Sequence, residues 1–97
     1  MTISQDNKIV VSISGELGFA TVPKLSKSNR KLILENKGIT FDLSRVTFSD
    51  NTGVAFLIAL VSFSKSVQKD ISFINVPAQL FALIEAVGVK ELLPILR

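Results

Sequence analysis

The chain has 97 residues, of which 47% are apolar and 20% are charged, and its net charge is +3. This length suits one domain over residues 1–97 with a single core, and the composition is that of a globular protein. The sequence contains no Cys and no His. Disulfides, thiolate nucleophiles, cysteine zinc sites and Ser-His-Asp triads are therefore excluded. Tyr and Trp are also absent, which disfavours nucleic-acid binding by base stacking.

The first eight residues lack the basic and then apolar plan of a signal peptide. The longest apolar run covers residues 54–61, far short of the roughly 20 residues that a membrane-spanning helix requires. We therefore expect a soluble, cytoplasmic domain that does not insert directly into a membrane.

Two short segments of alternating hydrophobicity open the chain. Ile3 begins the first, and residues 8–14 form the second, in which apolar residues recur at every other position. Asp6-Asn7 is a plausible turn between them, so the pattern predicts a hairpin that ends at Gly15.

A first helix is predicted to start at Thr21, whose side chain can cap it, with Pro23 tolerated in the opening turn. Residues 36–38 form its exit. Its apolar stripe consists of Val22, Leu25, Leu32 and Ile33.

This helix also holds a basic cluster of Lys24, Lys27, Arg30 and Lys31. Such a cluster usually forms a solvated face. The alternative is a contact with phosphate, lipid headgroups or an acidic partner.

Residues 39–44 alternate as a strand, and an apolar helix follows Gly53 from Val54 to Val67. The apolar residues of this helix fall into two stripes on roughly opposite sides. Such a helix is either flanked by neighbouring elements or covered by a partner protein.

Residues 71–74 predict a further short strand, and residues 75–77 open a third helix that ends at Gly88. The apolar tail at 92–96 predicts a last short strand or a packing segment. Strands alternating with helices indicate an α/β fold. We expect a mixed, mostly parallel sheet of four to five strands, with helices mainly on one face.

The segment between residues 41 and 53 contains the candidate site. A strand is followed by Asp50, Asn51, Thr52 and Gly53, which open the apolar helix. Free backbone N–H groups and the positive end of the helix dipole favour anions and hydrogen-bond acceptors at this position. The segment can therefore be a docking point, a phosphate site or only a helix cap.

An enzyme is a poor interpretation of this sequence. The carboxylates Glu16, Asp42, Asp50 and Glu85 are scattered, and no glycine-rich phosphate loop accompanies them. Asp42 is better explained by local hydrogen bonding. We expect no catalytic residue, no metal site and no cofactor.

The pattern resembles the STAS domain, the fold of anti-sigma-factor antagonists, over nearly the whole chain. The resemblance rests on Ser-Gly-Glu-Leu at 14–17, Phe-Asp-Leu-Ser-Arg-Val at 41–46, Asp-Asn-Thr-Gly-Val at 50–54, Ile-Asn-Val-Pro at 74–77 and Val-Gly-Val at 87–89.

Within that family, the size of the chain, residues 42–46 and the near-terminal Leu93-Pro94 resemble the MlaB-like branch. That branch consists of small cytoplasmic subunits of the bacterial Mla phospholipid ABC transporter. The resemblance implies a noncatalytic adaptor that binds the ATP-binding, MlaF-like subunit and, through it, the permease at the inner membrane. It implies a partner surface on the same loop and helix, formed by Asp50, Asn51, Thr52, Gly53, Ala55 and Ala59. For Ala55 and Ala59, helix–helix packing within the fold remains the alternative.

The chain departs from the family in two places. STAS antagonists that are switched by phosphorylation carry Ser or Thr directly after the Asp that opens the helix, at the position where this chain has Asn51 after Asp50. Asn51 has no hydroxyl to accept a phosphoryl group, and the adjacent Thr52 is a poor substitute. Gly18 stands where many relatives carry Asp.

Two other functions remain open. The chain could be an anti-sigma-factor antagonist that binds a kinase-like anti-sigma factor without phosphorylation at the usual site. It could also be a scaffold STAS module in a stress-sensing assembly.

Overall fold

The computed structural model describes residues 2–3 and 9–96. The elements in chain order are β1 (Thr2–Ile3), β2 (Ile9–Leu17), α1 (Val22–Glu35), β3 (Gly38–Ser49), α2 (Asn51–Ser66), β4 (Asp70–Ile74), α3 (Ala78–Val87) and the 3-10 helix η1 (Lys90–Leu92). The predicted turn at Asp6-Asn7 lies outside the described residues. None of the helices in the described part is both long and apolar enough to cross a bilayer.

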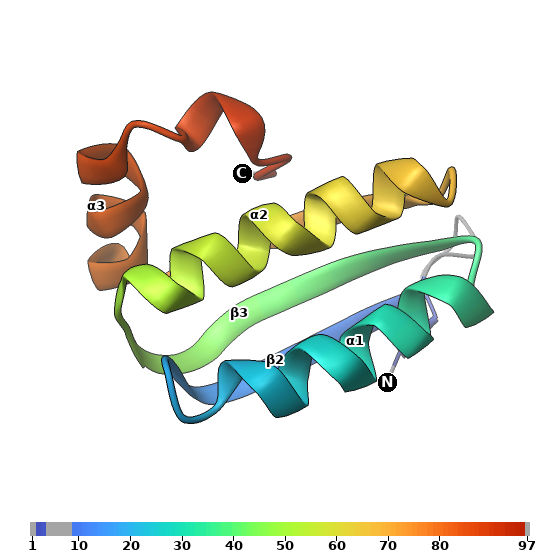
Figure 1. Cartoon of the computed structure of the whole chain (residues 1–97), viewed down its shortest axis with the longest axis horizontal. Coiled ribbons are helices and arrows are strands. Elements are labelled where there is room, and N and C mark those ends of the chain that lie inside the picture. The colour runs from blue at the N-terminus through green and yellow to red at the C-terminus, as the bar shows by residue number, and fades with distance from the viewer. Residues whose placement is uncertain (1, 4–8, 97) are drawn as a thin grey trace.

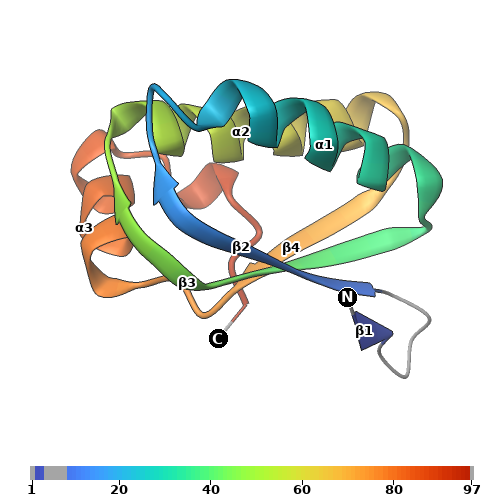
Figure 2. The same cartoon turned by 90° about the horizontal axis from the view of Figure 1, so that it is seen from below.

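The chain folds into one sheet with two helices packed side by side on one of its faces (Figure 1 and Figure 2). The strand order is β1-β2-β3-β4, and β2, β3 and β4 run parallel to one another. The two-residue β1 pairs with β2 in the antiparallel direction at one edge. Only three strands, β2, β3 and β4, form the parallel part of the sheet, and the two-residue β1 is its fourth strand, so the described residues contain no fifth strand of the kind that the expectation of four to five allowed.

Two bulges make β3 curl toward its carboxyl end. The register with β2 shifts between Ser12 and Ser14 and again between Gly15 and Glu16. The buried positions of β3 alternate regularly through Leu43 and then fall at Val46 and Ser49. Each bulge adds one extra residue to β3 relative to β2, so the alternation of buried and exposed side chains along β3 changes before α2 begins.

The core lies between the sheet and the helices α1 and α2. Phe41 of β3 and Phe73 of β4 are fully buried, with ring centroids 5.9 Å apart. Helix α1 contributes Ile33, and helix α3 adds Leu80 and Ile84 from the end of the sheet. These buried apolar side chains account for the stability of the layered fold.

Two local predictions at the end of β2 were wrong. Gly15 does not end the strand, since β2 continues to Leu17. Gly15 instead adopts a φ of 85° at the place where the register with β3 shifts. Thr21 stands at the N-cap of α1 but makes no capping hydrogen bond. Its Oγ1 instead accepts from the N–H of Gly18 at 3.0 Å and donates to the carbonyl of Glu16 at 2.7 Å. It thereby closes the loop between β2 and α1.

The tail forms a packing segment instead of a full strand. Residues 90–92 make the 3-10 helix η1, and Ile95 makes a single parallel bridge to Phe73. The N–H of Phe73 donates to Pro94 at 2.9 Å, and the N–H of Leu96 donates to Phe73 at 2.8 Å. Pro94 has no N–H to donate, which limits the ladder that this segment can make.

Candidate functional site

The candidate site lies where β2 and β3 end and α1 and α2 begin. The loop 18–21 leads from β2 into α1, and Asp50 alone connects β3 to α2. Both connections lie at the same end of the parallel sheet (Figure 1). We call this end of the molecule the tip and define it as Phe19, Phe48, Asp50, Asn51, Thr52 and Ala55.

Asp50 caps α2 and fixes the geometry of the tip. Its Oδ1 accepts hydrogen bonds from the N–H groups of Thr52 at 2.8 Å and Gly53 at 3.2 Å. Its own N–H donates to the carbonyl of Leu17 at 3.2 Å, which joins β2 to the start of α2. The helix therefore begins at Asn51, three residues before the predicted start at Val54. The carboxylate uses two of the N–H groups that an open helix end would offer to an anion.

Gly53 is buried and lets α2 approach the end of β2. A Cβ atom at this position would lie 2.6 Å from the Leu17 carbonyl oxygen and 2.8 Å from the Leu17 Cβ, and it would also clash with the Ser49 Oγ. Gly53 therefore permits a close backbone approach within the fold, and as a buried residue it does not itself form part of the exposed surface. No side chain fits in this space, so only glycine allows α2 to begin this close to the end of β2, and this close packing fixes the position of the tip.

Gly18 lies directly beside the carboxylate of Asp50. A Cβ at Gly18 would be 3.0 Å from the Asp50 Oδ2. An acidic side chain at this position would place a second carboxylate next to Asp50, which like-charge repulsion disfavours. The departure from the family pattern at Gly18 therefore leaves the cap of α2 undisturbed.

The outer surface of the tip is exposed and contains two aromatic rings. Asn51 and Ala55 are exposed, while Asp50, Thr52 and Ala59 are half-buried. Phe19 is 83% exposed and Phe48 is 52% exposed. Neither Phe could be recognised from the sequence as a surface residue, because a single apolar residue in a loop or at a strand end belongs to no periodic pattern that marks it as exposed.

Gln79 of α3 holds the end of β3 in place. Its Oε1 accepts from the N–H of Ser49 at 2.9 Å, and its Nε2 donates to the carbonyl of Ser49 at 2.8 Å. The side chain therefore satisfies both backbone groups of the residue before the cap. No local sequence pattern indicates this contact, since the two residues are 30 positions apart.

The two apolar stripes of α2 are explained largely by neighbours within the fold. Val54, Phe56, Leu57, Leu60 and Val61 are buried, and α2 contacts the sheet, α1 and α3. A narrower strip of small residues stays accessible on the outer side of the helix, formed by Asn51, Ala55, Ala59, Ser62 and Ser66. This strip continues the surface of the tip along α2.

Asp42 makes local hydrogen bonds at the first bulge of β3. Its Oδ1 accepts from the backbone N–H of Ser44 at 2.9 Å and from the Asn75 side chain at 3.3 Å. The backbone N–H of Ser44 lowers the pKa of Asp42, and the Ser44 side chain, Asn75 and Arg45 lower it further against the opposing effect of burial. The local role expected for Asp42 agrees with these contacts.

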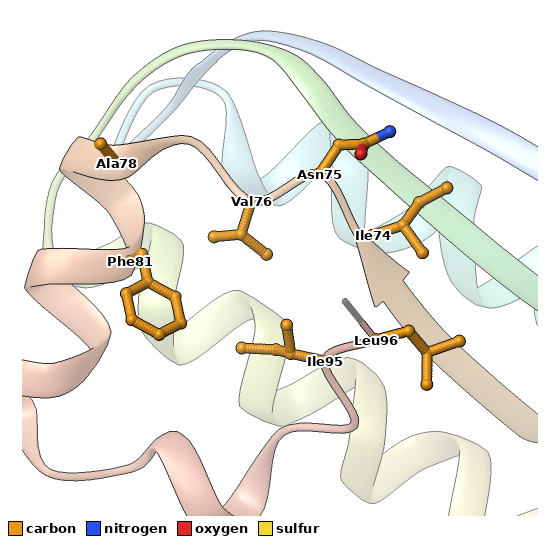
Figure 3. A pocket seen from close by; sticks show the side chains of 7 residues that line it. All are labelled: Ile74, Asn75, Val76, Ala78, Phe81, Ile95 and Leu96. Carbon is orange, nitrogen blue, oxygen red and sulfur yellow. The ribbon is translucent and has the colours of Figure 1, made fainter.

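An apolar pocket of about 560 Å³ lies at the β4 edge of the sheet, between α3, the end of β4 and the C-terminal segment. Figure 3 shows Val76, Phe81 and Ile95 around it, with the amide of Asn75 at one side. None of its lining residues is titratable. Among the described residues, no group of three or more acidic side chains is placed to hold a metal ion.

Replacing the cap tests how firmly the tip is fixed. We expect Asp50→Ala to lower the free energy of unfolding by about 1 kcal/mol, because two N–H groups lose their acceptor. Asp50→Asn keeps a side-chain oxygen and should stay within about 0.5 kcal/mol of the wild type. Urea denaturation measures both variants. Equal stability of Asp50→Ala and the wild type would show that the cap does not hold the helix.

The pKa of Asp42 gives a prediction about pH. Because its pKa in the fold lies below the usual value of 3.8, ionised Asp42 stabilises the fold above that value. The stabilisation is lost as the pH falls through the lowered pKa. We therefore expect Asp42→Asn to be less stable than the wild type at neutral pH, with a difference that disappears in strong acid. Urea titrations at a series of pH values measure this difference.

The Ser44→Ala variant is the control for this measurement. It removes the hydroxyl and keeps the backbone N–H that contributes most to the low pKa of Asp42. Its pH dependence should lie between those of the wild type and Asp42→Asn. A constant difference between Asp42→Asn and the wild type at every pH would contradict this account.

The fold and the capped tip define a class, the STAS domains. The family described as "Mlab, STAS domain" matches residues 1–95. The chain therefore belongs to the STAS family, in its MlaB-like group.

Individual relatives agree with this assignment. An anti-sigma-B factor antagonist of Staphylococcus aureus is 26% identical over 93 residues, which are 95% of this chain and 86% of that protein. The unphosphorylated form of the anti-sigma factor antagonist SpoIIAA has a similar fold, with a TM-score of 0.71 at 16% identity over 93% of this chain and 81% of that one. The STAS domain of a SulP transporter from Vibrio cholerae gives a TM-score of 0.72 at 13% identity, over 97% of this chain and 75% of that one. These likenesses relate the chain to antagonists and to transporter STAS domains.

Proposed function

We propose that the chain is a noncatalytic adaptor that binds the ATP-binding subunit of a phospholipid-transporting ABC complex, of the kind that maintains outer-membrane lipid asymmetry. The match to the MlaB-like group supports this proposal. In this role the chain is cytoplasmic and reaches the inner membrane only through the transporter. It supports assembly and activity of the complex, and it needs no cofactor.

The observation that carries the proposal is the exposed Asn51 on a fixed helix start. Its carboxamide can both donate and accept hydrogen bonds, but it cannot accept a phosphoryl group. The backbone around it is held by Asp50 and by the Gln79 contacts to Ser49. A surface that is already ordered loses little conformational entropy on binding. These features suit constitutive docking better than a phosphorylation switch.

The proposed contact surface consists of Asn51 and Thr52 at its centre, with Asp50 at its base and Ala55 and Ala59 along α2. The two alanines allow another backbone or a large side chain to approach closely. Gly53 supports this surface from inside the fold. Phe19 and Phe48 add apolar area, since exposed aromatic rings contribute strongly to association when they become buried.

The mechanism is thermodynamic linkage. A protein that binds one conformation of the ATP-binding subunit more tightly than another shifts the subunit toward that conformation. Binding also stabilises the subunit against unfolding, by an amount that grows with the concentration of the adaptor. The chain thus supports its partner without reacting with the nucleotide.

A second candidate is an anti-sigma-factor antagonist that binds a kinase-like anti-sigma factor. The similarity to the Staphylococcus aureus antagonist favours it. Asn51 then makes the antagonist independent of phosphorylation at the usual position.

A binding comparison separates the two candidates. The purified chain is titrated by calorimetry against the Mla-type ATP-binding subunit and against a kinase-like anti-sigma factor from the same organism. We expect a saturable complex with the ATP-binding subunit and none with the anti-sigma factor. The reverse result would refute the adaptor role and establish the antagonist.

A further inference from the structure

The outer face of α1 carries the net charge of the whole molecule. Lys24, Lys27, Arg30 and Lys31 are all exposed, and Glu35 is the only acid in the helix. Four cations against one acid leave α1 with a charge of +3, which equals the net charge of the chain. The seven other cations and seven other acids balance each other. We call the surface of these four cations the basic face.

Within the described residues, the lysines of the basic face have no neutralising partner. Lys24, Lys27 and Lys31 make no ion pair with any part of the chain that the structure describes. Arg30 has a different contact, because its guanidinium lies 5.3 Å from the ring centroid of Phe63 on α2. Three unpaired ammonium groups along one helix produce a positive electrostatic potential that attracts a negatively charged partner.

The basic face lies next to the proposed docking surface. Helices α1 and α2 contact each other and lie side by side on the same face of the sheet (Figure 2). The N-terminus of α1 follows directly from the loop that holds Phe19. Arg30 joins the two helices at the edge of the basic face. A partner large enough to cover the tip together with Ala59 would therefore extend onto the neighbouring α1.

The chemistry of the basic face favours a protein partner over a lipid surface. A helix that binds in a membrane interface turns its apolar side outward, toward the lipid. The apolar side of α1 faces the core instead, and Leu34 is the only large apolar residue that the helix exposes. Lysines on a helix whose apolar side is buried in the fold suit a contact with carboxylates at the rim of a protein interface.

We propose that the basic face of α1 binds a surface rich in Asp and Glu on the same partner that receives the tip. This inference rests on the proposed function, since it concerns the same complex. The charges speed the encounter of the two proteins and orient it, while the tip provides most of the lasting affinity. Charged groups at an interface rim act mainly on the association rate and on its dependence on salt.

The test uses a triple charge reversal, Lys24→Glu, Lys27→Glu and Lys31→Glu, in the full chain. Its matched control is Lys37→Glu, Arg45→Glu and Lys69→Glu, which changes the net charge equally away from the outer face of α1. Association with the purified Mla-type ATP-binding subunit is followed by stopped-flow measurements from about 0.05 to 0.5 M salt. Circular dichroism verifies that both variants remain folded. For the α1 variant this is expected because Glu and Lys have similar helix propensities, whereas the three control positions lie outside the helices.

We expect the reversal on α1 to slow association at least about tenfold at low salt, and the control to slow it much less. The difference should shrink toward the highest salt concentration. Equal rates for the two triple variants would overturn the inference while leaving the adaptor role in place. Failure of the wild-type chain to bind the subunit at all would overturn both. A third possible result is that the wild type sediments with phosphatidylglycerol vesicles and the α1 variant does not, while the variant still associates with the subunit at the normal rate. That result would show that the basic face binds lipid, and it would overturn the inference.

Discussion

Gly53→Ala is expected to lower the free energy of unfolding by about 3 kcal/mol, the largest effect of a single methyl group that we predict in this chain. The added Cβ would meet the backbone oxygen of Leu17 at 2.6 Å, and a backbone atom cannot turn away as a side chain can. Either α2 or the end of β2 must shift. For a domain of this size the loss corresponds to a fall in melting temperature of roughly 15 °C. Calorimetry and urea denaturation measure both quantities.

Gly88→Ala is the matched control, since it adds the same methyl group at another helix end. Gly88 follows α3 with a φ of 82°, and a Cβ there would meet no atom within 4 Å. Its cost of about 1–2 kcal/mol comes from the left-handed backbone alone. If Gly53→Ala were no more destabilising than Gly88→Ala, α2 and β2 would not be packed as closely as described.

Asn51→Arg is expected to weaken binding to the ATP-binding subunit at least about 100-fold, or about 2.7 kcal/mol. A long cation would occupy the position at which the partner must approach the helix start. Its effect on folding should stay below about 1 kcal/mol, because Asn51 is exposed and the cation meets only the unfavourable end of the helix dipole. Thr52→Arg should act in the same direction. Calorimetric titration of each folded variant gives the dissociation constants.

Ser66→Arg serves as the control for these two variants. It places the same side chain on the exposed side of α2, but in the last turn of the helix. Its binding should remain within about threefold of the wild type, as for residues outside an interface centre. Wild-type affinity in both Asn51→Arg and Thr52→Arg would remove the tip from the interface.

The order of strands and helices was largely predictable because the periods of the sequence are clear. Alternation at Ile39, Phe41 and Leu43 marks the inward face of β3, and each of these residues is buried. The extension of β3 to Ser49 could not be predicted in the same way. Its two bulges break the period of two, so residues 45–49 do not look like a strand.

The contacts that fix the tip were harder to predict than the tip itself. Asp50 followed by a small residue and an apolar run indicates a cap, and the structure has this cap. The contacts of Gly53 with Leu17 and of Gln79 with Ser49 join residues that are distant in the sequence. Such contacts depend on how the sheet and helices pack, and local propensity contains no information about them.

The central claim is that this chain docks on the ATPase of a lipid transporter. It is tested most directly by tagging the chain at its C-terminus, purifying it from its own cells in mild detergent and identifying the proteins bound to it by mass spectrometry. The proposed function predicts recovery of an ABC ATP-binding subunit together with a membrane permease, and loss of both with Asn51→Arg. Recovery of a kinase-like ATPase without membrane components would contradict the claim and assign the chain to sigma-factor control.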